Sequence, residues 1–236
     1  MQLISNSLPL IFEGALNTIA ITLIAVGLGC IIGLFAGLAR LSKKRTISFL
    51  ATCYIDFFRG TPLLVQIFMV YFGLPQLLSS FQNFLIDQFA IQQIWESTHI
   101  EPWPAAIIST SLNSGAYIGE IFRAGVQSIE RGQMEAARSL GMTHVQAMRY
   151  VILPQAFRRV IPPLGNEFIA MLKDTSLLSV IGFEEMARRG QLIVSFSYKP
   201  FHIWTTVALI YLIMTLGISR FVDFLERRLR TSDDHR

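Results

Sequence analysis

Polar side chains lie inside long apolar segments of this sequence, where an uncompensated charge is costly. Asn113, Tyr117 and Glu120 follow one another at i, i+4 and i+7, which places them on one face of a helix. A charged side chain at the centre of a bilayer costs about 2.5–3.5 kcal/mol on insertion scales, so such residues usually face protein or water. The face is therefore either a pathway for a polar solute or a polar contact between helices.

A second polar group, Lys-Asp-Thr-Ser-Leu at 173–177, interrupts a later apolar segment. If the α-helix continues through it, Asp174, Leu177, Leu178 and Ile181 share a face, and Thr175 and Ser176 lie beside it. Carboxylates suit an ammonium group, and hydroxyl groups suit a carboxylate. The alternative is a fixed ion pair between subunits that involves Lys173 and Asp174.

The composition indicates a membrane protein. Of 236 residues, 52% are hydrophobic and only 15% are Asp, Glu, Lys or Arg, and the mean hydropathy is +0.49, whereas soluble domains carry about 25% charged residues. The two cysteines, Cys30 and Cys53, cannot form a disulfide framework or a Cys-ligated zinc site. The net charge of +4 is explained by basic loops, so we expect no nucleic-acid partner.

A membrane-spanning helix needs about 20 mostly apolar residues. We expect an all-α integral membrane protein, with 1–236 as one domain and five spans whose approximate bounds are 14–39, 60–78, 102–126, 161–183 and 201–222.

The basic residues predict the orientation of these spans. Thirteen lysines and arginines lie in 40–45, 131–159 and 227–236, against three in 188–199 on the opposite side. Because basic residues accumulate in cytoplasmic loops, the N-terminus is predicted outside and the C-terminus inside.

The cytoplasmic loop at 127–154 carries a helical pattern that Gly141 interrupts. Glycine adopts a positive φ at low cost, so two short helices can meet there at a sharp angle. The small side chains of Ala136 and Ala137 permit another surface to approach closely. An ordinary helical hairpin on the membrane is the alternative.

The spacing in this loop resembles the EAA loop of ABC importer permeases. It has Glu135-Ala136-Ala137, then Gly141, and then an aliphatic residue before Leu153-Pro154; that residue is Val151 here, where the family more often has isoleucine. Three further segments, 59–62 (RGTP), 113–117 (NSGAY) and 173–177 (KDTSL), are similar to the polar-amino-acid subfamily of type I importers.

The resemblance covers nearly the whole chain and implies a bacterial cytoplasmic (inner) membrane complex. Two ATPase subunits, a second permease copy or paralogue, an extracytoplasmic solute-binding protein and an amino-acid substrate are its expected partners, besides the lipid bilayer. The implied ATPase-coupling residues are Glu135, Ala136, Ala137, Leu140, Gly141 and Pro154. The candidate substrate-binding residues are Asn113, Ser114, Tyr117, Glu120, Asp174, Thr175, Ser176 and Leu177.

ATP and Mg²⁺ are expected in the partner ATPase and not in this chain. A phosphate-binding loop of the form G-x-x-x-x-G-K-[ST] requires a lysine after a glycine, and no lysine here follows one. No metal site is expected from the scattered histidines.

An ion-coupled secondary transporter is the alternative function, although proteins of that class usually have more spans or inverted repeats in one chain. A membrane enzyme is a third class, but no catalytic constellation is visible. The sequence does not specify which amino acid is carried.

Overall fold

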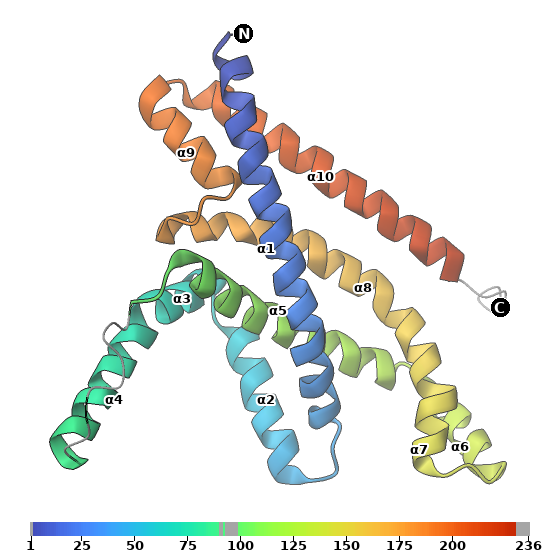
Figure 1. The fold of residues 1–236 in the computed structure, drawn as a ribbon. Coiled ribbons are helices and arrows are strands. Elements are labelled where there is room, and N and C mark those ends of the chain that lie inside the picture. Colours follow the sequence, from blue (N-terminus) through green and yellow to red (C-terminus); the bar gives the residue numbers. More distant parts are fainter. Residues whose placement is uncertain (1, 90–91, 93–98, 230–236) are drawn as a thin grey trace.

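The computed structural model describes residues 2–89, 92 and 99–229, and every regular element within them is helical. Figure 1 shows α1 crossing the other long helices, with α9 and the start of α10 near its N-terminal end and α2 near its C-terminal end. The elements in chain order are α1 (Gln2–Arg40), α2 (Arg45–Gly60), α3 (Leu63–Phe68), η1 (Met69–Gly73), α4 (Leu74–Phe89), α5 (Pro102–Gln127), α6 (Arg131–Ser139), α7 (His144–Ala147), η2 (Met148–Ile152), α8 (Leu153–Asp174), η3 (Thr175–Ile181), α9 (Met186–Ser197) and α10 (Pro200–Leu229).

Three helical segments in the described residues are long and apolar enough to cross a membrane: Ile4–Arg40, Leu63–Phe89 and Pro200–Arg228. Helix α5 has 26 residues and is about 39 Å long, which also suffices to cross the hydrocarbon layer, but its polar residues lower its hydropathy. Many large apolar side chains on α1, α4 and α10 are exposed in the isolated chain, as expected when lipid or partner subunits cover them. The chain is therefore an all-helical membrane protein.

The contact between α1 and α5 is made through small residues. A Cβ atom added to Gly33 would lie 2.8 Å from the Gly115 carbonyl oxygen and 2.8 Å from the Gly119 nitrogen. One turn further on, a Cβ atom on Gly37 would lie 2.6 Å from the Gly119 carbonyl oxygen. Small residues spaced four apart let two membrane helices bring their backbones together, and van der Waals packing then holds them. This contact fixes the helix that carries the first group of candidate residues.

The segment expected as the fourth span, 161–183, differs from a single α-helix. Helix α8 begins at Leu153, ends at Asp174 and is followed by the 3₁₀ helix η3. Because a 3₁₀ helix has three residues per turn, the face predicted from α-helical spacing is only partly correct. Leu178 and Ile181 share the buried face, whereas Asp174 is exposed and Leu177 is half-buried. The buried face follows a spacing of three, with Thr175, Leu178 and Ile181 inside.

The segment expected as the second span, 60–78, begins and ends later in the structure, as the continuous helical segment Leu63–Phe89. Helix α2 ends at Gly60, the chain bends at Thr61 and Pro62, and α3 then runs into the π-helical turn η1 before α4. Proline fixes φ near −65° and lacks an N–H donor, so the position before a new helix costs it little. In Figure 1 α4 extends away from the other helices.

Candidate functional site

The amide of Asn113 holds the bend between α2 and α3 against α5. Its Nδ2 donates a hydrogen bond of 2.9 Å to Oε1 of Gln66, and both side chains are buried. Nε2 of Gln66 in turn donates to the carbonyl oxygens of Phe58 and Thr61 at 2.8 and 3.0 Å, and lies 2.9 Å from the Thr61 hydroxyl. Asn113 therefore has a protein partner, as expected if this face of α5 forms a polar contact between helices.

Ser114 lies on a different side of α5, toward α8 and α1. Its hydroxyl donates a hydrogen bond of 3.2 Å to Oε1 of Glu167, a half-buried residue of α8. Gly29 of α1 packs on the same serine, because an added Cβ atom there would lie 3.0 Å from Oγ of Ser114. A carboxylate is thus brought to the junction of three long helices.

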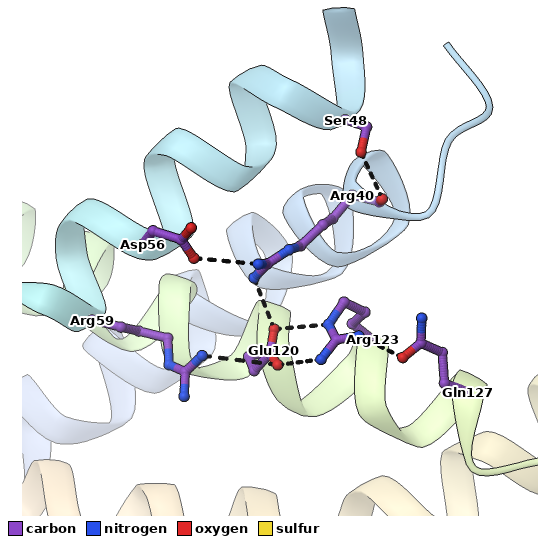
Figure 2. Close-up of polar contacts among 7 residues, drawn as sticks. All are labelled: Arg40, Ser48, Asp56, Arg59, Glu120, Arg123 and Gln127. Carbon is purple, nitrogen blue, oxygen red and sulfur yellow. Dashed lines mark hydrogen bonds and ion pairs between the residues drawn. The ribbon is translucent and has the colours of Figure 1, made fainter. Parts of the chain in front are cut away.

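Glu120 is the centre of an ion-pair cluster that joins α1, α2 and α5 (Figure 2). One carboxylate oxygen accepts from Arg40 at 3.0 Å and from Nε of Arg123 at 2.9 Å. The other oxygen accepts from the Arg123 guanidinium and lies 3.8 Å from Arg59. Arg40 also lies 3.3 Å from Asp56. The Glu120 side chain is 21% exposed, so this cluster is a tertiary contact and not a surface pair.

Tyr117 completes the face predicted from the i, i+4, i+7 spacing. The guanidinium of Arg59 lies over its ring, 5.6 Å from the centroid. Cations over aromatic faces are attracted by the ring quadrupole. The face of Asn113, Tyr117 and Glu120 is therefore directed at the α2–α3 region of the same chain.

Asp174, Thr175, Ser176 and Leu177 lie where α8 changes to the 3₁₀ helix. Asp174 is exposed and forms no ion pair within the described part of the chain, whereas the Thr175 hydroxyl is buried and donates to the Leu172 carbonyl oxygen at 2.8 Å. Ser176 and Leu177 are half-buried. The predicted residues are thus divided among three places: the α2–α3 contact, the α5–α8 contact and the end of α8.

The loop that contains Gly141 forms a helical elbow, defined here as residues 131–147, which comprises α6, the bend and α7. Gly141 has a φ of +85°, as its expected role in a sharp bend requires. Thr143 then caps α7 reciprocally with Gln146, through hydrogen bonds of 3.3 and 2.8 Å. These local contacts fix the angle at which the two short helices meet.

The elbow separates its small residues into an inner and an outer face. Ala137 is 4% exposed and packs against the chain's own helices, whereas Glu135, Ala136 and Gly141 are exposed. Leu140 is 82% exposed. Pro154 is exposed in the first turn of α8, where proline is tolerated. Val145 of α7 is also 74% exposed, so two apolar side chains are presented on a mostly polar loop, which suits protein contact.

Several functional contacts were not predicted from the sequence. Gln66 and Arg40 lie 47 and 80 residues from their partners on α5, and no local spacing relates them. Glu167 was visible as a charge within an apolar segment, and that position was the available signal. The pairing of Arg123 with Glu120 is local, because the two residues lie three positions apart on α5.

The fold is that of a helical membrane protein with an exposed elbow, and comparison with known proteins specifies the family. Residues 25–231 match the family described as "Binding-protein-dependent transport system inner membrane component", and the chain belongs to it. The resemblance inferred from the motifs is thereby confirmed. Family membership also decides against an ion-coupled secondary transporter.

Similar proteins in bacteria cover nearly the whole chain. The glutamine transport system permease protein GlnP of Escherichia coli (strain K12) is 41% identical over 95% of this chain and 94% of its own length. The arginine transport system permease protein ArtQ of Bacillus subtilis (strain 168) is 36% identical over 96% of this chain and 95% of its own. The nopaline transport system permease protein NocM of Agrobacterium fabrum (strain C58 / ATCC 33970) is 37% identical over 96% and 90%.

Solved structures show the same architecture. A chain from the crystal structure of an amino acid ABC transporter with histidines has a TM-score of 0.82 and 41% identity, covering 95% of this chain and 96% of that one. A chain from inward-facing conformations of the MetNI methionine ABC transporter has a TM-score of 0.71, covering 95% and 98%. At 19% identity the second likeness concerns the fold alone.

Proposed function

We propose that this chain is the permease subunit of an ATP-driven, binding-protein-dependent importer of polar or charged amino acids. Its family and its relatives, which are named for glutamine, arginine and nopaline transport, support this function. Because relatives of similar identity are named for different solutes, the proposal is limited to the class of substrate.

The proposed topology has five spans and an external N-terminus. The spans are α1, the run from α3 to α4, α5, α8 with η3, and α10. The excess of basic residues in 40–45, 131–159 and 227–236 supports a cytoplasmic location for the elbow and the C-terminus. The membrane is the bacterial inner membrane, in accordance with the family description.

The proposed coupling surface is the elbow, and the exposure of Leu140 is the observation that carries this proposal. A mostly polar loop, fixed by local contacts, that presents the apolar side chains of Leu140 and Val145 suits a groove on an ATPase subunit. Glu135, Ala136, Ala137, Leu140, Gly141 and Pro154 remain the proposed coupling residues. Movement of the ATPase would reach α5 and α8 because the elbow is anchored between them.

The proposed substrate path runs along the α5–α8 side. Ser114, with Glu167 beside it, and the group Asp174 to Leu177 supply hydroxyl and carboxylate oxygens there. Carboxylates at these positions suit the ammonium group of an amino acid. The contacts of Asn113, Tyr117 and Glu120 support a different role, which is to hold the α2–α3 bend against α5.

The proposed complex contains two permeases, two ATPases that bind ATP and Mg²⁺, and an extracytoplasmic solute-binding protein. The exposed side chain of Asp174 supports a path that a second permease copy or paralogue completes. Closed two-fold symmetry is common among such assemblies.

The test uses two glycine variants of the elbow in reconstituted complexes. Gly141→Pro replaces a φ of +85° by one near −65°, so it reorients α6 relative to α7. Gly132→Ala is the control, because an added Cβ atom there meets nothing within 4 Å and α6 continues through it. We expect Gly141→Pro to insert into the membrane but to lose the ATP hydrolysis that substrate-loaded binding protein stimulates. Normal stimulation by this variant would contradict the coupling role.

A further inference from the structure

A cavity of about 230 Å³ lies where the C-terminal end of α1 meets α5 and the start of α8. Its lining is apolar throughout and includes Leu38 and Leu41 of α1, Phe122 of α5, and Leu153 and Phe157 of α8. Apolar cavities of about 150 Å³ stay dry and accept apolar ligands, so a polar solute is not a suitable occupant here. The chemistry of the lining fits a hydrocarbon chain.

The cavity is accessible from the outer surface of the bundle. Leu38 of α1 is 40% exposed, and Leu153 and Phe157 of α8 are also exposed. Helices α1 and α8 here belong to a membrane protein, so the medium beside this surface contains acyl chains. An acyl chain can therefore enter sideways, between α1 and α8.

The chain beyond the α1 wall of the cavity is strongly basic. Arg40 ends α1, and Lys43, Lys44 and Arg45 follow within five residues, the last three with exposed side chains. None of these three side chains has an ion-pair partner among residues 2–89, 92 and 99–229. A basic cluster at a helix end near the membrane surface attracts anionic lipid, by about 1 kcal/mol per basic residue.

We propose that this cavity binds one acyl chain of an anionic phospholipid whose phosphate is held by the basic segment Lys43, Lys44 and Arg45. The apolar lining alone would accept any hydrocarbon, and the basic segment alone would attract any anion. Their adjacency at the end of α1 selects a molecule that carries both groups. The proposal concerns lipid binding by the chain itself and does not depend on the proposed transport function.

The cavity half of the proposal is tested by lipid binding to the full chain in its assembled complex. Binding of phosphatidylglycerol and phosphatidylcholine with 16- to 18-carbon chains would be titrated by native mass spectrometry. We expect phosphatidylglycerol to bind at least about tenfold more tightly. Leu38→Trp fills the cavity and should weaken the binding of both lipids, because an acyl chain can then no longer enter. Ile31→Trp is the matched control, because Ile31 is an exposed α1 residue outside the lining.

The charge half is tested by Lys43→Gln with Lys44→Gln, compared with Arg227→Gln and Arg228→Gln at the exposed end of α10. We expect about a 30-fold loss of phosphatidylglycerol affinity only for the lysine variant, because two basic residues are removed. This variant keeps the proposal testable if Leu38→Trp fails to fold. Equal affinity for both lipids would overturn the proposal. Equal losses of affinity for Leu38→Trp and Ile31→Trp, or for the lysine and arginine variants, would also overturn it. If Leu38→Cys forms a disulfide with a cysteine of a partner subunit, the cavity is a contact between proteins and not a lipid site.

Discussion

Asn113 on α5 and Gln66 on α3 are joined by a buried hydrogen bond of 2.9 Å, and the same glutamine amide holds the bend at Thr61. One side chain thus connects a turn between two helices to the middle of a third. This relationship gives Asn113 a structural explanation that does not require a ligand. The two roles are separable by experiment.

We expect Asn113→Leu and Gln66→Leu each to destabilise the protein by about 1–3 kcal/mol, because each leaves a buried polar partner unsatisfied. The double variant should lose less than the sum, since neither partner then remains. The measurement is the free energy of unfolding in detergent, combined as a double-mutant cycle. Additive losses together with impaired substrate binding would instead assign Asn113 to the ligand site.

The glycine contact between α1 and α5 predicts a strong difference between two similar substitutions. Gly33→Leu should separate the helices, because even its Cβ atom would lie 2.8 Å from backbone atoms of α5. We expect a loss of several kcal/mol, at the upper end of overpacking effects. Gly27→Leu is the control, because a Cβ atom there meets nothing within 4 Å, and it should be neutral or slightly stabilising. The measurement is the thermal unfolding temperature of both variants, and equal temperatures would contradict a close backbone contact at Gly33.

Glu120→Gln removes the negative charge that three arginines share. We expect a loss of about 1–3 kcal/mol, since hydrogen bonds to a charged group are broken and Arg40, Arg59 and Arg123 then repel one another. Asp56→Asn should cost less than about 1 kcal/mol, because its side chain is 59% exposed. Unfolding at low and high salt measures both effects. If the two variants were equally stable, Glu120 would not be the centre of the cluster.

Asp174→Asn should weaken substrate-stimulated uptake more than it weakens assembly of the complex, because its exposed carboxylate has no partner in the described chain. Lys173→Gln, which changes the adjacent charge, is the control for a purely electrostatic effect on folding. Uptake into proteoliposomes and the yield of assembled complex are the two readouts. Loss of assembly with unchanged uptake by the surviving complex would make Asp174 a structural residue.

The local parts of this structure were predictable from the sequence, and the tertiary contacts were not. The expected third span has nearly the bounds of α5 because prolines mark its start, and the bend at Gly141 was legible because glycine tolerates a positive φ. The change to a 3₁₀ helix after Asp174 was missed, because a single α-helical period was assumed throughout.

The pairing of Glu120 with Arg40 was missed for a different reason. The two residues lie 80 positions apart, so only the packing of α1 on α5 brings them together. A single sequence carries no local signature of such a pair. The same limit applies to Gln66, whose role depends on a bend that folds α3 back toward α5.

Helix α1 packs against its neighbours through glycine backbone in both its N-terminal and its C-terminal half. Near its start, a Cβ atom on Gly14 would lie 2.8 Å from Cα of Met186, and near its end Gly33 and Gly37 meet α5 just as closely. Because no side chain separates the backbones at these points, a sliding or rotation of α1 against α9 or α5 would produce steric clashes. The first helix therefore acts as a rigid connection, so that a tilt of the C-terminal half of α5 is transmitted to the start of α9.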